Sequence, residues 1–85
     1  MARLERLLLI VLRGTSDANI AFEDLRRLLL GLGFEERIRG SHHVYRRSGV
    51  EDKLNLQRDG AKAKPYQVRQ VRTVILKHRL GDRIE

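Results

Sequence analysis

The chain has 85 residues, 41% of them hydrophobic, and no cysteine. This length accommodates one domain with a modest core, and without cysteine a disulfide framework and a thiolate metal site are excluded. The 18 Lys and Arg residues outnumber the 11 Asp and Glu residues, and the formal net charge of +7 favours an anionic partner, either nucleic acid or an acidic protein. The longest apolar run, residues 7–12, is too short to span a bilayer, so we expect a cytoplasmic protein with no membrane partner.

Two helices are predicted in the first 33 residues. Apolar residues recur at helical spacing over residues 3–13, and Gly14 is placed to end that helix. Leu9 and Ile10 lie off its main apolar face, so this helix is either buried on more than one side or contributes to an oligomer contact. A second amphipathic stretch begins near Phe22, carries acids in its first turn, and stops at Gly33.

Three short strands are predicted next, over residues 34–39, 42–47 and 51–57, with turns at Gly40-Ser41 and Ser48-Gly49. Connections this short make the strands an antiparallel meander. Leu54 and Leu56 then share one face of the third strand, opposite a polar face.

The last predicted helix runs from Pro65, which suits a first helical position, to about Leu80, with Gly81 ending it. Val68, Val71, Ile75 and Leu76 are its expected inward residues. The fold class is therefore α+β, with three helices around a three-stranded antiparallel sheet, in a single domain over residues 1–85.

Gly40-Ser41-His42-His43 is the segment that most suggests chemistry. Small residues permit a tight turn and close approach of a ligand, and histidine is the side chain that titrates near neutrality. The combination suits proton transfer on a phosphate-bearing polymer, although neighbouring histidines are more commonly ordinary surface residues. A metal site is not expected, because adjacent strand histidines diverge and no carboxylate or cysteine completes a ligand set.

In this order of elements the chain resembles the HicA toxins of HicA/HicB toxin-antitoxin pairs. The resemblance covers residues 22–80 and rests on four segments in sequence: Leu32-Gly33-Phe34, Arg39-Gly40-Ser41-His42-His43-Val44-Tyr45, Leu54-Asn55-Leu56-Gln57 and Lys62-Ala63-Lys64-Pro65. Two features depart from the family. The helix before Ile20 is extra, so residues 1–19 form an N-terminal extension to a core of residues 20–80, and the third strand lacks the Val-Pro-type segment of many members.

The resemblance implies a fold similar to double-stranded-RNA-binding domains, and a metal-independent endoribonuclease that cleaves mRNA and is neutralised by a HicB-type antitoxin. A homodimer and a hetero-oligomer with that antitoxin are both left open, because the extra N-terminal helix departs from the family. No cofactor is expected. His42 matches the family's catalytic position and is the expected general acid/base, and a one-residue shift in the alignment would give that role to His43.

The expected RNA contacts are basic residues around the histidine turn and at the start of the last helix, with the turn serine: Arg37, Arg39, Ser41, Arg46, Arg47, Lys62 and Lys64. Arg69 and Arg72 on the last helix could also bind phosphate, and for these two, as for Lys62 and Lys64, a solvated basic surface is an equally good interpretation. Tyr45 is a candidate to stack on a base, but a core position is the more usual role. A noncatalytic RNA-binding module on the same fold, such as a decayed toxin, remains the alternative function.

Overall fold

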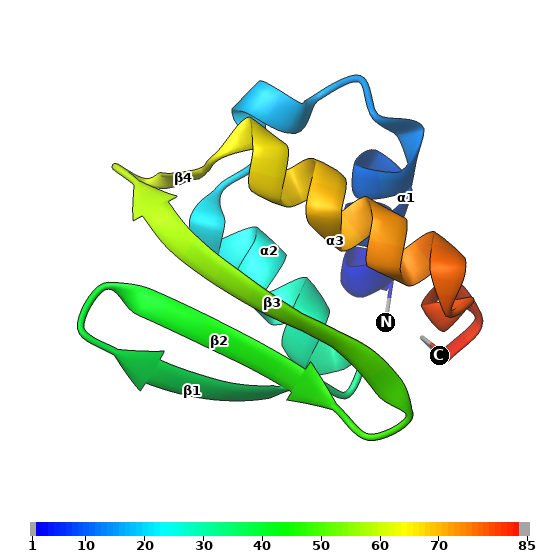
Figure 1. Ribbon diagram of the computed structural model, residues 1–85. Coiled ribbons are helices and arrows are strands. Elements are labelled where there is room, and N and C mark those ends of the chain that lie inside the picture. The colour runs from blue at the N-terminus through cyan, green and yellow to red at the C-terminus, as the bar shows by residue number, and fades with distance from the viewer. Residues whose placement is uncertain (1, 84–85) are drawn as a thin grey trace.

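The computed structural model describes the backbone of residues 2–83 and the side chains of residues 4–81. It is an α+β protein with three α-helices and a four-stranded antiparallel sheet in the order β1-β2-β3-β4 (Figure 1). The elements follow in the order α1 (Ala2–Arg13), a short 3-10 turn η1 (Asp17–Asn19), α2 (Phe22–Gly31), β1 (Glu35–Arg39), β2 (His42–Arg47), β3 (Val50–Asp59), β4 (Lys62–Ala63), α3 (Pro65–Lys77) and η2 (Leu80–Arg83).

The predicted meander is confirmed for β1, β2 and β3, but the prediction of only three strands is wrong. β3 continues to Asp59, and a turn at Gly60, which has a left-handed φ of +63°, brings the chain back as β4. β4 pairs with the end of β3, and its other side bonds the segment before α2, where the amide of Ala63 donates to the carbonyl of Ile20 at 2.9 Å. The fourth strand thus ties the sheet to the start of α2.

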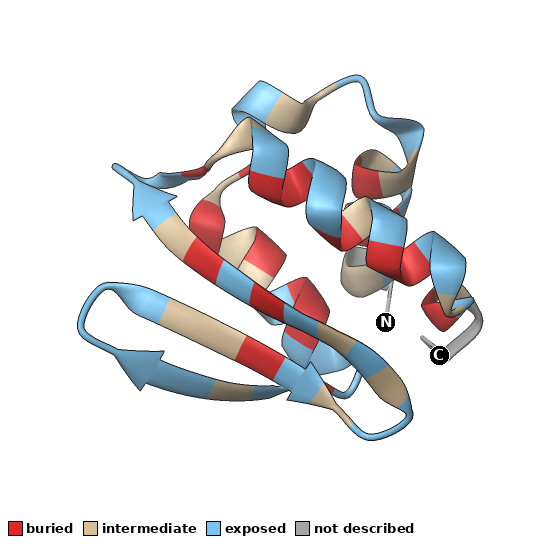
Figure 2. Cartoon of the chain, in the orientation of Figure 1, coloured by how far each residue is buried: buried red, intermediate tan, exposed pale blue. Residues whose placement is uncertain are grey.

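The core lies between one face of the meander and the helices (Figures 1 and 2). Strand alternation directs Tyr45, Leu54 and Leu56 to this face, and all three are buried. The helices contribute the following buried residues: Leu8 and Val11 of α1, Phe22, Leu25, Leu28 and Leu29 of α2, and Val68, Val71, Val74 and Ile75 of α3.

The N-terminal helix α1 shares this core, contacting both α2 and α3. The guanidinium of Arg72 in α3 donates to the carbonyl of Val11 at 3.0 Å and to both carboxylate oxygens of Asp17 at 2.9 and 3.1 Å. The Arg72 hydrogen bonds lower the pKa of Asp17. These contacts fix the extension of residues 1–19 to the last helix. Leu9 is 57% exposed, so α1 is buried on one side only.

Helix α3 ends at Lys77, three residues earlier than predicted. Arg79 has a left-handed φ of 53°, and the chain turns there so that Leu80 is buried in the core. The prediction that Leu76 faces inward is also wrong, because its side chain is 61% exposed.

One buried polar side chain joins α3 to the edge of β3. Gln67 is 1% exposed, and with its amide oriented so that both groups are satisfied, its nitrogen donates to the backbone carbonyl of Gln57 at 3.1 Å and its oxygen accepts from the backbone amide of the same residue at 3.0 Å. The Gln67 side chain therefore pairs with the backbone amide and carbonyl of Gln57, as a neighbouring strand would, and it fixes the start of α3 beside Gln57. Within the described residues, no helix has the length and apolarity needed to cross a bilayer.

Candidate functional site

The two adjacent histidines lie on opposite faces of the sheet. His42 is exposed on the face that points away from α2, together with Val44 and Arg46. His43 is half-buried on the other face, with Tyr45, which is fully buried. This arrangement is the one that strand alternation predicts. The two imidazoles therefore cannot act on the same phosphate.

His42 stands at the start of β2, where Gly40 has the left-handed φ of +57° that its turn requires. Its Nδ1 lies 3.4 Å from the side-chain oxygen of Asn55 on β3. With the proton on Nδ1, the ring donates weakly to Asn55 and leaves Nε2 as its basic nitrogen. The amide of Gln57 donates to the hydroxyl of Ser41 at 3.1 Å and so braces the turn that carries His42.

An open groove of about 310 Å³ lies at His42, between β3 and the first turns of α3. Its lining is entirely polar or amphipathic: His42, Lys53, Asn55, Gln57, Tyr66, Gln67 and Gln70. Such a groove can receive a polar, charged chain and present it to an imidazole.

The sheet face around His42 is mainly basic, and its acidic member is Glu35, the cross-strand partner of Arg46. Arg39 and Gln57 are the cross-strand partners of His42, while Arg37 and Asn55 flank Val44. Arg37, Arg39, Arg46 and Lys53 are side chains without a carboxylate at ion-pair distance among residues 4–81. Cations in this state can interact with phosphate groups without first breaking an ion pair.

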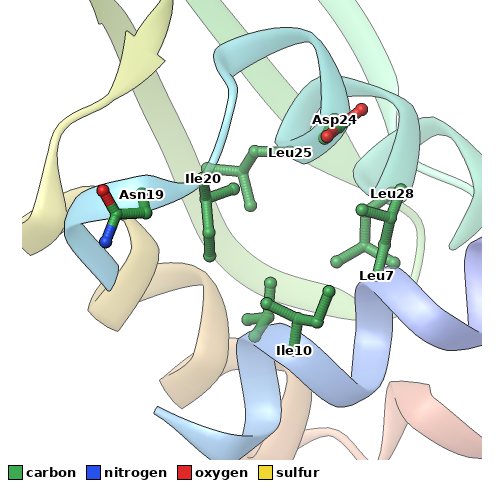
Figure 3. A pocket seen from close by; sticks show the side chains of 8 residues that line it. Leu7, Ile10, Asn19, Ile20, Asp24, Leu25 and Leu28 are labelled. Carbon is green, nitrogen blue, oxygen red and sulfur yellow. The ribbon is translucent and has the colours of Figure 1, made fainter. Parts of the chain in front are cut away.

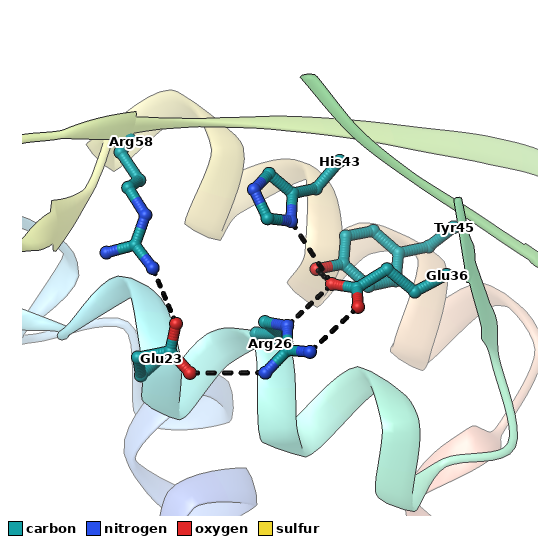
Figure 4. Close-up of polar contacts among 6 residues, drawn as sticks. All are labelled: Glu23, Arg26, Glu36, His43, Tyr45 and Arg58. Atoms are coloured by element: carbon teal, nitrogen blue, oxygen red, sulfur yellow. Dashed lines mark hydrogen bonds and ion pairs between the residues drawn. The ribbon is translucent and has the colours of Figure 1, made fainter. Parts of the chain in front are cut away.

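His43 belongs to a polar cluster under the sheet (Figure 4). Its Nδ1 lies 3.2 Å from Oε2 of Glu36, and Nδ1 carries the hydrogen because an ionised carboxylate can only accept. The same oxygen accepts from the Tyr45 hydroxyl at 2.5 Å and from Arg26 Nε at 2.7 Å. The His43 ring also packs edge-on against Phe22, with centroids 4.9 Å apart.

The charges in this cluster are stabilised by one another. The Arg26 hydrogen bond, with smaller contributions from Tyr45 and His43, lowers the pKa of Glu36 from 4.5 to about 2 although burial opposes the shift. Burial, and then the hydrogen bond to Glu36, raise the pKa of Tyr45. Glu23 extends the cluster by pairing with Arg26 at 3.2 Å and with Arg58 at 2.6 Å. These contacts describe a structural network that joins α2 to β1, β2 and β3.

The residues predicted to contact RNA fall into three groups. Arg37, Arg39, Ser41 and Arg46 share the outer sheet face or the turn with His42. Arg47 does not, because its side chain turns to the other side and its Nε donates to the carbonyl of Leu32 at 2.8 Å, just after α2.

Lys62 and Lys64 form the third group. They are the chain neighbours of Ala63 in β4, which pairs with the last two residues of β3 at the end of the sheet. The residue of β3 just before these two is Gln57, the cross-strand partner of His42. The Lys62 ammonium lies 3.5 Å from the side-chain oxygen of Asn19.

Tyr66, like Lys53 and Gln70, is a groove residue that the sequence reasoning missed. It is 48% exposed, in the first turn of α3. Its exposure could have been predicted, because Tyr66 lies off the apolar stripe of Val68, Val71 and Ile75 and therefore points away from the core. Gln67 contacts Gln57 where α3 meets β3, and helical periodicity alone does not predict that contact.

A second, apolar cavity of about 60 Å³ lies between α1 and α2 (Figure 3). Leu7 and Ile10 of α1 face Leu25 and Leu28 of α2 across it, and Asn19 is at its rim. Asp24 is the one ionisable side chain in its lining. Among the described residues, no three His, Asp or Glu side chains are grouped so as to hold a metal ion.

Comparison of the chain with protein-family models, with curated proteins and with solved structures produced no match. The residues and their geometry are therefore the basis for assigning a function. They define a small basic α+β protein with one exposed histidine in a polar groove.

Proposed function

We propose that this protein is a HicA-type toxin, an endoribonuclease that cleaves mRNA without a metal ion and uses His42 as its general acid/base. The proposal takes its family from the ordered segments that carry the resemblance, above all Gly40-Ser41-His42-His43 and Lys64-Pro65 at the start of the last helix. The fold would then be the double-stranded-RNA-binding type, extended here by α1 and by the short strand β4.

The observation that carries the proposal is the setting of His42. Its imidazole is exposed in a polar groove, Asn55 is positioned to orient it, and basic side chains surround it without ion-pair partners among residues 4–81. His43, by contrast, is engaged by Glu36 and Phe22 beneath the sheet. Of the two histidines, His42 is therefore the better candidate.

The chemistry follows from that setting. Nε2 of His42 takes the proton of a ribose 2′-OH while the 2′ oxygen attacks the adjacent phosphorus. The bond from phosphorus to the 5′ oxygen breaks, and that oxygen takes up a proton from the imidazolium or from water. The products are a 2′,3′-cyclic phosphate and a 5′-hydroxyl. Arg39, the cross-strand partner of His42, and Lys53, which lines the same groove, stabilise the negative charge that develops on the phosphoryl oxygens.

The basic surface also suits a HicB-type antitoxin whose acidic surface covers the groove, and the cytoplasm is where mRNA and antitoxin would meet. The net charge of +7 is consistent with both partners. One surface would then bind either RNA or antitoxin, which accounts for neutralisation by simple competition.

The test is induced expression of the wild-type chain, His42→Ala and Arg27→Ala, with growth and mRNA integrity followed over time. Arg27 is the control, because it is exposed on α2, which lies on the other side of the sheet from His42, and it lines neither groove beside β3. We expect growth arrest and mRNA loss with the wild type and Arg27→Ala, and neither with His42→Ala. Intact mRNA with the wild type, together with salt-dependent RNA binding by the purified protein, would instead identify a noncatalytic RNA-binding module.

A further inference from the structure

The groove at His42 continues along α3. A second open groove, of about 500 Å³, lies between β3 and α3 and shares Lys53, Tyr66 and Gln70 with the first. Its other lining residues are Asp52, Leu54, Arg69, Thr73 and Val74. Tyr66 thus stands where the two grooves meet, with His42 in one and Arg69 in the other.

Tyr66 differs from the other aromatic residues of the chain. The chain contains two Phe and two Tyr residues, and Phe22, Phe34 and Tyr45 are each at most 4% exposed, whereas Tyr66 is 48% exposed. An aromatic ring kept at the surface of a small basic protein, inside a polar groove, contributes little to the core. It offers a flat apolar face to whatever occupies the groove.

The charge of the groove favours an anionic occupant. Lys53 and Arg69 line it, and the carboxylate of Asp52 is already held by the ring of His78 at 2.9 Å and by the ammonium of Lys77 at 3.3 Å. The pKa of Asp52 is lowered by these two hydrogen bonds, His78 first. The acid is therefore neutralised by its own neighbours, and the cations of the groove remain available.

We propose that this continuous groove is a subsite for single-stranded RNA, in which one nucleobase stacks on Tyr66 and the adjoining phosphates lie along Lys53 and Arg69. The amide of Gln70, which lines both grooves, is placed to meet the edge of the stacked base. The subsite would hold a nucleotide next to the phosphodiester presented to His42. The inference rests on the proposed RNA substrate, but it does not require cleavage.

A single strand fits this arrangement better than a duplex. The faces of paired bases are covered by their neighbours, so a protein aromatic ring can stack only on a base that is unpaired or displaced. Recognition by Tyr66 would therefore select exposed, single-stranded regions of a message, in contrast to the recognition by shape that a double-stranded-RNA-binding fold suggests.

The chain contains no tryptophan, so Tyr66→Trp supplies a single fluorescent reporter in the subsite. The probe is a short single-stranded oligoribonucleotide with 2′-O-methyl groups, which removes the nucleophile and prevents cleavage. We expect this probe to quench the tryptophan emission of the Tyr66→Trp variant saturably, and a duplex of the same sequence to quench it much less. Leu76→Trp is the control, since Leu76 is 61% exposed on the same helix but outside both grooves, and the emission of that variant should not change. Equal quenching in both variants, or none in either, would overturn the proposal.

Affinity measurements separate stacking from charge. We expect Tyr66→Phe to bind the probe within about twofold of the wild type, and Tyr66→Ala to bind between about fivefold and about a hundredfold more weakly, which is the range for one stacked base. A probe with abasic sites, equal in charge, should bind the wild type about as weakly as the normal probe binds Tyr66→Ala. If Tyr66→Ala binds as tightly as the wild type, the subsite is wrong even where RNA is cleaved. If binding depends on Tyr66 but no RNA is cleaved, the subsite stands and the proposed nuclease activity falls.

Discussion

His42 and His43 follow one another in the chain, yet the first lines an open groove and the second contacts Glu36 beneath the sheet, with Nδ1 3.2 Å from Oε2. The separation comes from the pleat of β2, which sends successive side chains to opposite faces. A single strand thus exposes one imidazole in the groove and uses the other to hold the sheet to α2.

The different surroundings of His42 and His43 predict different losses of folding stability when each is replaced by alanine. His42→Ala should change the free energy of unfolding by no more than about 0.5 kcal/mol, as is usual for an exposed side chain. His43→Ala should lose about 1–3 kcal/mol, because it removes the ring from Phe22 and leaves Glu36 with one partner fewer. Urea unfolding of the two purified variants measures both values. A large loss for His42→Ala would mark it as a packing residue and would count against a catalytic role.

The Glu36 network predicts a stability that depends on acid pH. The pKa of Glu36 is about 2 in the folded protein, below its ordinary value of 4.5. The stabilisation is therefore complete above about pH 4.5 and is lost as the pH falls towards 2. Thermal melts across this range should show the loss, and Glu36→Gln should make that part of the curve shallower while lowering stability at neutral pH by about 2 kcal/mol. If the melting temperature of Glu36→Gln falls with pH as steeply as that of the wild type, other carboxylates, such as Asp17, dominate the loss of stability in acid.

Arg46 and Arg47 are a matched pair for testing the proposed RNA-binding face. Arg46 is exposed on the face of His42, whereas Arg47 is directed to the carbonyl of Leu32. We expect Arg46→Ala to weaken binding of single-stranded RNA and to reduce the slope of log affinity against log salt by about 0.7, the value for one phosphate contact. Arg47→Ala should lower stability and leave that slope unchanged. The reverse pattern would place the RNA on the opposite face of the protein.

Gln67 predicts a local effect at the edge of the sheet. Gln67→Ala should expose the backbone amide and carbonyl of Gln57, destabilise the fold by about 2 kcal/mol, and speed hydrogen exchange at the Gln57 amide. By strand alternation the amide of Leu56 points to β2 instead, so its exchange should respond only to the global loss of stability. Gln70→Ala, exposed one turn further along α3, is the control variant and should change neither quantity. Unaltered exchange at Gln57 would mean that Gln67 does not pair with this edge.

Much of the fold could be predicted from local patterns. The positions of the three helices, the meander of β1 to β3 and the opposite directions of His42 and His43 follow from periodicity and short turns, which act over a few residues. The same alternation places Tyr45 in the core, its more usual role, and the residue is fully buried there.

The features that could not be predicted depend on contacts between distant residues. β4 exists because the chain after Gly60 meets the segment before α2, where Ala63 bonds Ile20. The groove lies where α3 meets β3, a junction made by the shared apolar core and by the contact of Gln67 with Gln57, and the position of the Arg47 side chain depends on where the chain emerges from α2. The spacing of residues in the sequence predicts which way each of these side chains points, but it does not predict which residue the side chain contacts.

The most direct test of the central claim is cleavage of a single-stranded RNA by purified protein in the presence of excess EDTA, with wild type and His42→Ala compared at equal folded concentration. We predict that the wild type leaves 2′,3′-cyclic phosphate and 5′-hydroxyl ends, and that His42→Ala is slower by between about a hundredfold and about ten-thousandfold, the usual contribution of a general acid/base. Equal rates for the two proteins, or cleavage that EDTA abolishes, would contradict the assignment of His42 as the catalytic group of a metal-independent nuclease.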